Sequence, residues 1–250
     1  MKAFPFFCLA WFTGALSTLV EAQTYDTNNV VVQTFAGSGF SGYVDDQGTL
    51  TMFNGPSSIV CDSSGNLFVA DSGNERIRKI TPDGTVSTFA GGGASAVPGF
   101  GTNVSLASFT FGSMAIDHSN ALLIAYGSSN VLRIESNAYV SRLLVCPTNA
   151  NGGICVDSDN NIYTTAGRRI FRRSITGVIE VFAGSGNSGS VDGNGIFTSF
   201  SNPAELVADA ANNIYVWDSG GNQLMRRVDQ NREVVTVAGK KGVTANADGI

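Results

Sequence analysis

Charged residues are scarce in this chain of 250 residues. They make up 14% of the sequence, against about 25% in an ordinary soluble domain. The formal net charge is -5, and a negative field repels both phosphate backbones and anionic lipid. This balance excludes a disordered tail, a charged coiled coil and a nucleic-acid binder driven by charge. We therefore expect no nucleic-acid partner.

Metal-binding and catalytic residue types are also rare. His118 is the only histidine, and both a Ser-His-Asp hydrolase and a histidine-ligated zinc site would need it. The acidic pairs near Asp45 and Asp192 are better explained as turn residues than as a calcium site, because calcium needs about six to eight oxygen ligands. The sequence therefore predicts no catalytic group, no metal and no cofactor.

Long hydrophobic runs are missing after residue 20. Lys2 precedes an apolar run over residues 3–20, and residues 20–22 resemble a cleavage site before Gln23. We predict a signal peptide over residues 1–22 and an exported chain from residue 23, secreted or at the cell surface, with no membrane insertion after cleavage. An uncleaved signal anchor is the alternative, since the run is at the lower limit for crossing a bilayer.

Glycine is abundant instead, with 30 residues, and much of it belongs to an internal repeat. Segments 35–37, 89–91, 182–184 and 237–239 all end in Ala-Gly. A turn led by aspartate recurs in step with them and begins at Asp62, Asp117, Asp157 and Asp209. Self-similarity of this kind indicates stacked repeat units. The chain contains four.

Each unit has the pattern of four short strands. In the first unit, strands are predicted over 58–61, 67–70, 76–80 and 85–90, and the inner ones are apolar runs typical of sheets covered on both faces. Such sheets stack around an axis as blades. The predicted fold is therefore an all-β propeller of four-stranded antiparallel blades, over about 57–90, 112–146, 152–183 and 203–238, within a domain spanning 23–250.

The first and fourth units resemble NHL repeats. Residues 67–80 and 214–218 carry that pattern, and the linker residues 183–186 and 192–195 resemble the long-linker NHL domains of bacterial surface proteins and teneurin-like ectodomains. Units two and three depart from the pattern, because they lack the aspartate found at Asp71 and Asp218. The resemblance implies the fold more firmly than the function. It also supplies an enzymatic alternative, a calcium-dependent lactonase or esterase.

The number of blades is predicted to leave the ring incomplete. The similar propellers have about six blades and are closed by an N-terminal strand, whereas this chain has four units, an extra outer strand over 30–36 and the start of a further linker over 239–250. We expect either a truncated sequence or blades supplied from elsewhere. A closed ring of four blades with one strand left over is the alternative.

Because the four strands of a blade run antiparallel, their connecting loops alternate between the two faces of the propeller. The loops between the second and third strands share one face with the linkers between blades, and we call this the linker face; the other turns form the plain face. The linkers over 37–56 and 184–203 are long, and loops of that length are uncommon unless functional. We predict a non-catalytic module that binds a protein or glycan ligand through this face. The predicted contact residues are Tyr43, Asp45, Asp71, Asn74, Asp192, Asn194, Asp218 and Asn222.

Three smaller predictions concern single residues. Asp71 is expected to pair with Arg76 across the hairpin that joins their strands. A Cys146–Cys155 disulfide would bridge the short linker between the second and third units, with buried thiols as the alternative. Asn103 begins the one glycosylation sequon of the chain, Asn103-Val-Ser105, in a long linker that we assign to the linker face; it matters in a host that glycosylates exported proteins.

Overall fold

The computed structural model describes residues 32–107, 112–126, 130–147, 150–221 and 223–240. Residues 1–33 and 34–250 form two separate units. All the described strands belong to the second unit. The predicted signal peptide lies outside the described residues, and so do residues 241–250 of the predicted final linker. Among the residues that are described, no helix is long and apolar enough to cross a membrane.

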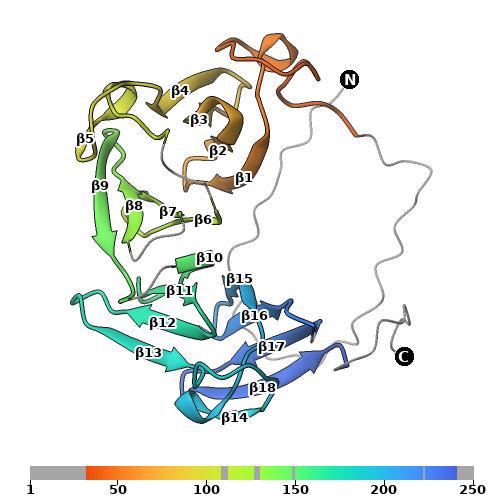
Figure 1. The fold of residues 1–250 in the computed structure, drawn as a ribbon. Helices are drawn as coiled ribbons and strands as arrows, with labels where there is room; N and C mark the ends of the chain where they lie inside the picture. Colours follow the sequence, from red (N-terminus) through yellow and green to blue (C-terminus); the bar gives the residue numbers. More distant parts are fainter. Residues whose placement is uncertain (1–31, 108–111, 127–129, 148–149, 222, 241–250) are drawn as a thin grey trace, which may run out of the picture. The chain divides into compact units, whose positions relative to one another are not determined.

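Four antiparallel sheets follow one another along the second unit, each with four strands in sequence order (Figure 1). The first contains β1 (Pro56–Cys61), β2 (Leu67–Asp71), β3 (Arg76–Ile80) and β4 (Val86–Gly91). The second contains β6 (Met114–Ile116), β7 (Leu122–Ala125), β8 (Asn130–Ile134) and β9 (Tyr139–Leu144). The third contains β10 (Ala150–Val156), β11 (Ile162–Ala166), β12 (Arg169–Arg173) and β13 (Ile179–Ala183). The fourth contains β15 (Pro203–Ala208), β16 (Ile214–Asp218), β17 (Leu224–Val228) and β18 (Glu233–Ala238).

Short elements in the linkers complete the sheets. β5 (Gly99–Phe100) pairs with β9, and β14 (Gly193–Asn194) pairs with β18, so each adds a fifth strand to an outer edge. Three linkers each contain one 3-10 turn, namely η1 (Gly48–Leu50), η3 (Gly101–Asn103) and η4 (Gly195–Phe197). A fourth such turn, η2 (Ser72–Asn74), joins β2 to β3.

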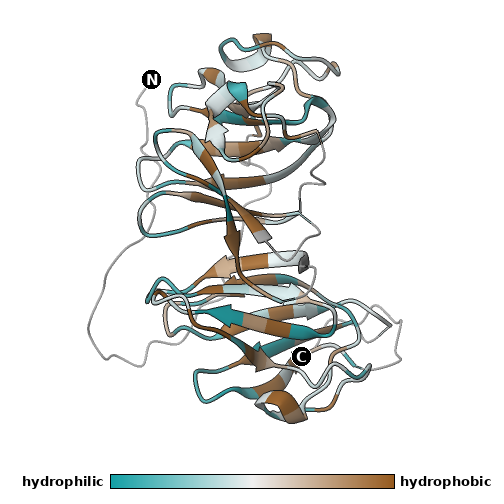
Figure 2. Cartoon of the chain, turned by 60° about the vertical axis from the view of Figure 1, so that its left-hand side comes forward, coloured by the Kyte–Doolittle hydropathy of each residue, from teal (hydrophilic) through white to brown (hydrophobic). Residues whose placement is uncertain are grey.

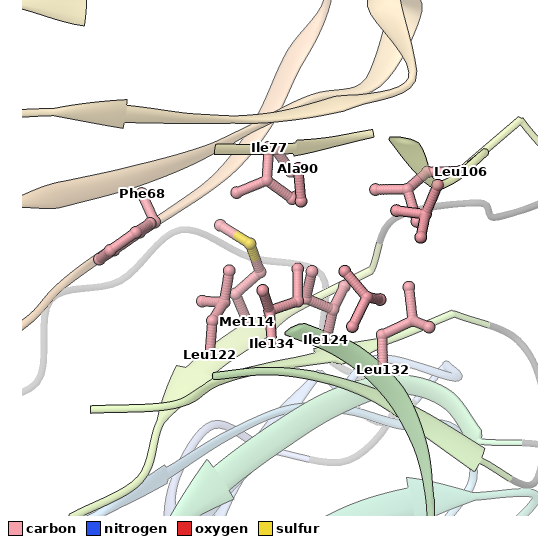
Figure 3. Close-up of a cluster of buried hydrophobic side chains, with 12 residues drawn as sticks. Phe68, Ile77, Ala90, Leu106, Met114, Leu122, Ile124, Leu132 and Ile134 are labelled. Carbon is pink, nitrogen blue, oxygen red and sulfur yellow. The ribbon is translucent and has the colours of Figure 1, made fainter. Parts of the chain in front are cut away.

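The hydrophobic core lies between neighbouring sheets. Phe68 and Ile77 of the first sheet pack with Met114, Leu122 and Ile124 of the second (Figure 3). The innermost strands β1, β6, β10 and β15 pack in that order, each against the next. Figure 2 shows apolar residues along the strands and hydrophilic residues in many of the turns. The prediction of an all-β propeller with four blades is confirmed.

The four blades do not close into a ring. Leu206 in β15 packs against the third blade and is only 8% exposed, whereas Ile59, its counterpart in β1, is 59% exposed. On the opposite side of the fourth blade, Val207 is also 59% exposed. Within the described part of the chain, these two blade faces lack the neighbouring blade that covers the equivalent faces elsewhere.

The extra outer strand predicted over 30–36 does not form in the described residues 32–36. A strand needs the hydrogen-bonding edge of another strand. Thr34, Phe35 and Ala36 lie instead against the face of the first blade, next to β1 and Phe53. Because a sheet face offers no backbone donors or acceptors, this segment forms no strand there.

The blades are joined on the plain face by a repeated contact between turns. The side-chain oxygen Oδ1 of Asn160 accepts a hydrogen bond of 3.0 Å from the backbone N–H of His118 in the preceding blade. Asn120 and Asn212 make the same contact to Ser63 and Ser158. All three asparagines have positive φ, between 59° and 64°, which asparagine tolerates better than most residues.

The predicted Cys146–Cys155 disulfide is wrong. The two residues are buried and are not bonded to each other. Cys146 packs with Ala166 and Phe171, while Cys155 belongs to another cluster, with Tyr163 among its members. The two thiols therefore contribute to separate parts of the core.

Candidate functional site

The linkers take a longer path than strand parity predicts. Each begins and ends at the linker face, but its middle runs along the outer edge of a blade to a turn of the plain face. The N–H of Gly48 donates to the carbonyl of Gly84 (2.9 Å), and that of Gly195 donates to Arg232 (2.8 Å). Only part of each linker is therefore available on the linker face, which corrects the predicted assignment.

A buried arginine holds the first linker on its blade. Arg78 makes five hydrogen bonds and has no exposed side-chain surface. Its guanidinium group donates to Asp45 (2.6 Å), to Asp71 (2.9 Å) and to the carbonyl groups of Val44 and Met52. Every guanidinium N–H is thereby satisfied. The linker carries two of the acceptor carbonyls and one of the two carboxylates, so its conformation depends on Arg78.

The fourth blade repeats this arrangement at matching positions. Arg226 donates to Asp192 (2.7 Å) and to the carbonyl groups of Val191 and Ser199, and it lies 3.7 Å from Asp218. Like Arg78, it has no exposed side-chain surface. We call each of these two clusters a linker clasp: Arg78, Asp45 and Asp71 in the first blade, and Arg226, Asp192 and Asp218 in the fourth.

The second and third blades replace the clasp with apolar residues. Leu132 and Phe171 occupy the register position of Arg78, and Ala166 occupies that of Asp71 in the third blade. An isolated buried charge is costly. Because these two blades lack both the arginine and the aspartate, neither charge is left buried without its partner. The sequence shows that the second and third units lack the aspartate. It also shows that they lack the matching arginine, and this paired loss is the signal that could have identified the clasp.

The structure brings four of the eight predicted contact residues, all of them aspartates, into the clasps, where their carboxylates bond within the chain. Asp71 and Asp218 are fully buried. The predicted Asp71–Arg76 ion pair is wrong, because Asp71 pairs with Arg78, diagonally across the same face of the hairpin. Arg76 instead lies over the ring of Tyr43, 4.1 Å from its centroid.

The remaining predicted contact residues differ in exposure. Asn74 is half-buried and bonds Asp71 and the carbonyl of Gly42. Tyr43 is 45% exposed and shares a hydrogen bond of 2.9 Å with Thr88. Asn194 is exposed at the outer edge, where it donates to the carbonyl of Asn231. Asn222 lies outside the described residues.

Small uncharged polar side chains gather where the linkers meet the linker face. In the first blade, Ser41 donates to Asn54 (3.0 Å), and Ser57 shares a hydrogen bond of 2.5 Å with Ser72. Corresponding groups of the fourth blade are Ser188, Ser201, Asn202 and Ser219. Hydroxyl and amide groups both donate and accept, so they suit a neutral polar ligand.

Two hollows adjoin this region on the uncovered face of the first blade. One, of about 490 Å³, is lined mainly by apolar groups that include Phe35, Phe53 and Ile59. The other, of about 650 Å³, is formed by the start of the first linker, including Phe40 and Ser41. They share Phe53 and Pro56 and therefore border each other.

The plain face has a third hollow, of about 370 Å³, between the second and third blades. Burial acts to raise the pKa of Asp117, but hydrogen bonds from Ser119, Ala121 and Arg133 outweigh it and hold the pKa below its usual value. Arg133 also pairs with Glu135 at 2.9 Å. The charges of Asp117 and Arg133 are therefore matched within the chain. Arg173, which also lines the hollow, donates to the carbonyl of Ser174 (3.4 Å).

In the described ranges, no three His, Cys, Asp or Glu residues are grouped so that they could hold a metal ion. In the two linker clasps the carboxylates are neutralised by arginine.

Comparison with known proteins agrees with this architecture. The family model of the NHL repeat matches residues 53–80, which run from the end of the first linker to the end of β3. The resemblance to NHL-repeat propellers is confirmed. No curated protein matches this NHL-type propeller.

Several solved structures share its fold. Virginiamycin B lyase from Staphylococcus aureus is 16% identical, with a TM-score of 0.51 over 73% of this chain and 55% of the lyase. A streptogramin B lyase is 13% identical, with a TM-score of 0.55 over 79% of this chain and 56% of its own. An auxiliary nutrient binding protein from Bacteroides ovatus is 14% identical, with a TM-score of 0.56 over 76% and 48%. The NHL-type propeller spans about half the length of these proteins.

These comparisons overturn the prediction that the chain is not an enzyme. That prediction rested on the shortage of catalytic residue types, but lyases are built on the same fold. A propeller places side chains from several blades around one axis, so a site can be assembled from residues that are isolated in the sequence. At such low identity the likeness concerns the fold, and it assigns no reaction to this chain.

Proposed function

We propose that this NHL-type propeller is an exported protein, secreted or held at the cell surface, that binds a protein or glycan ligand through its linker face. The supporting observation is the pair of linker clasps. Each buries an arginine with no exposed side-chain surface in order to fix one long linker. Ordering a loop before binding reduces the entropy lost on binding, which is the usual advantage of a preorganised surface.

The clasps divide the contact residues of this proposal into two groups. Asp71 and Asp218 are buried and help to hold the linkers in place. Tyr43, Asp45 and Asp192 are partly exposed and can reach a ligand, whereas Asn194 lies at the outer edge, where it bonds a turn of the plain face. The hydroxyl and amide groups around Ser41 and Ser188 add neutral donors and acceptors. This composition favours a polar, uncharged ligand surface such as a glycan or a peptide backbone.

The test begins by finding a ligand. The purified chain from residue 23 is applied to an array of immobilised glycans and to a panel of purified extracellular protein domains, and the affinity of each hit is measured by biolayer interferometry. Ser41→Glu and Ser188→Glu each place a charge on the exposed linker face. We expect each substitution to weaken binding at least tenfold, which corresponds to about 1.4 kcal/mol.

Matched controls lie on the plain face. Ser64 and Ala211 are exposed and occupy equivalent positions in the turns of the first and fourth blades. Ser64→Glu and Ala211→Glu introduce the same charge and should leave the affinity unchanged. Loss of binding in these plain-face variants, with retention in the linker-face variants, would place the contact surface elsewhere. Absence of any hit on either panel would also count against the proposal.

A further inference from the structure

The glycosylation sequon lies at an exposed position that all three long linkers share. Asn103 is the last residue of η3 and is exposed. Its counterparts at the ends of the other two linker turns are Leu50 and Phe197, which are 66% and 80% exposed. The side chain at this position therefore faces solvent whatever its chemical type, and the second linker alone carries asparagine there.

The backbone around the sequon is held firmly, so an attachment to the side chain does not require the fold to change. The N–H of Gly101 donates to the carbonyl of Ala138 (2.8 Å). The carbonyl of Asn103 accepts from Ser95 (3.0 Å), and the N–H of Ser105 donates to the carbonyl of Ser95 (2.8 Å). A Cβ on Gly93 would collide with the carbonyl group of Asn103. This close approach adds a second contact that fixes the turn.

We propose that Asn103 carries an N-linked glycan, an inference that rests on the proposed export of the chain. The side-chain nitrogen of Asn103 bonds to the anomeric carbon of a lipid-pyrophosphate-linked oligosaccharide. The bond from that carbon to the pyrophosphate oxygen breaks, the amide loses one proton to a base of the transferase, and the lipid pyrophosphate leaves. No oxidation or reduction takes place, and Ser105 completes the recognition sequence.

The position keeps the glycan away from the proposed ligand. Because Gly101 bonds to Ala138, η3 lies at the outer edge of the second blade beside the turn that joins β8 to β9. That turn belongs to the plain face. The glycan projects next to Phe100, an exposed aromatic residue of the edge strand β5 that contacts Tyr139. It therefore covers an apolar part of the blade edge and leaves the linker face open.

The test uses expression in a eukaryotic secretory host, with the leader of a host protein in place of residues 1–22. Secreted protein is treated with peptide-N-glycosidase F, and its intact mass is compared before and after. The enzyme converts a modified asparagine to aspartate, which peptide mass spectrometry locates. We expect a glycosidase-sensitive mass on the unsubstituted chain and on Ser105→Thr, and its complete loss in Asn103→Gln and Ser105→Ala.

Asn137→Gln is the matched control, because Asn137 is an exposed asparagine on the adjoining turn that begins no sequon; it should keep the added mass. A secreted, folded chain without a glycosidase-sensitive mass would overturn the inference, as would a mass that survives Asn103→Gln. A parallel expression with the chain's own residues 1–22 tests export separately. If the chain's own residues 1–22 fail to direct export while the chain with the host leader is still glycosylated, the result would count against the proposed localisation alone.

Discussion

Arg78 and Asp71 form an ion pair of 2.9 Å in which neither side chain has any exposed surface. Burying two charges is costly, and the attraction between them repays that cost only if their other donors and acceptors are also satisfied. Here they are, because Asp71 accepts from the backbone N–H of Asn54 (2.7 Å) and Arg78 donates to linker carbonyls. The pair therefore connects the blade to two separate parts of the first linker, residues 44–45 and 52–54.

Arg78→Leu should destabilise the protein by about 3–5 kcal/mol, the usual cost of leaving a buried charge without its partner. Asp71 would remain in the core with its carboxylate unpaired. The measurement is urea unfolding followed by circular dichroism at pH 7. The double variant Arg78→Leu with Asp71→Ala imitates the apolar third blade and should recover a large part of the loss. A single variant within 1 kcal/mol of the parent would show that the clasp does not hold the linker.

Asn160→Gly should lower the free energy of unfolding by about 1 kcal/mol. Glycine keeps the positive φ of 64° but removes the hydrogen bond to the backbone N–H of His118, and such a bond contributes about 0.5–1.5 kcal/mol. Ala138→Gly is the matched control, because Ala138 has a φ of 66° and no such side-chain contact. That substitution relieves backbone strain and should raise stability by up to about 1 kcal/mol. Equal losses in both variants would contradict the inter-blade contact.

Acid should unfold the protein partly through Asp117. Its pKa in the folded state lies below the ordinary value of 3.8, so the stabilisation is complete above that value and is lost as the pH falls through the lower, folded pKa. Asp117→Asn should be less stable than the parent at pH 7, and the difference should shrink as the pH falls below the ordinary pKa of 3.8. Urea midpoints across this range measure it. His118→Ala, in the same exposed turn, should leave the acid dependence unchanged.

The thiols should differ in reactivity. Cys61 is exposed, whereas Cys146 and Cys155 are buried, and burial followed by the charge of Asp157 raises the pKa of the Cys155 thiol. The thiolate is the reactive form. A disulfide reagent added to the native chain from residue 23 should modify Cys61 first and the other two only after unfolding. Cys61→Ser should abolish the fast phase. Two unreactive thiols after full unfolding would restore the Cys146–Cys155 bridge.

Much of the fold could be predicted from the sequence because its determinants are local. Asp62 begins a turn by accepting the backbone N–H groups of Ser64 and Asn66, and the same geometry returns at Asp157. Aspartate makes this contact with its own neighbours in the chain, so spacing alone reveals it. The strand lengths and the four blades follow from that spacing.

The bonding inside the candidate site could not be predicted from residue spacing, because its contacts join distant parts of the chain. Asp45 and Asp192 are predicted contact residues, and the structure shows that each also bonds an arginine more than 30 residues away. Asp71 faces both Arg76 and Arg78 on one side of a hairpin, and sequence spacing favours the nearer of them. The linker decides between the two arginines, because its backbone carbonyls of Val44 and Met52 accept hydrogen bonds from the farther one.

The sequence by itself determined the repeat, the turns, the blade strands, the sequon at Asn103 and the number of units that leaves the ring incomplete, since these depend on local residues and on their repetition. The tertiary structure alone decided that the linkers follow the outer edges, that Asn103 is exposed there and that Asp71 is buried beneath the linker. Those outcomes depend on which surfaces meet after the blades have stacked. Packing of that kind has no signature in residue spacing, because the groups that satisfy a buried charge come from segments far apart along the chain.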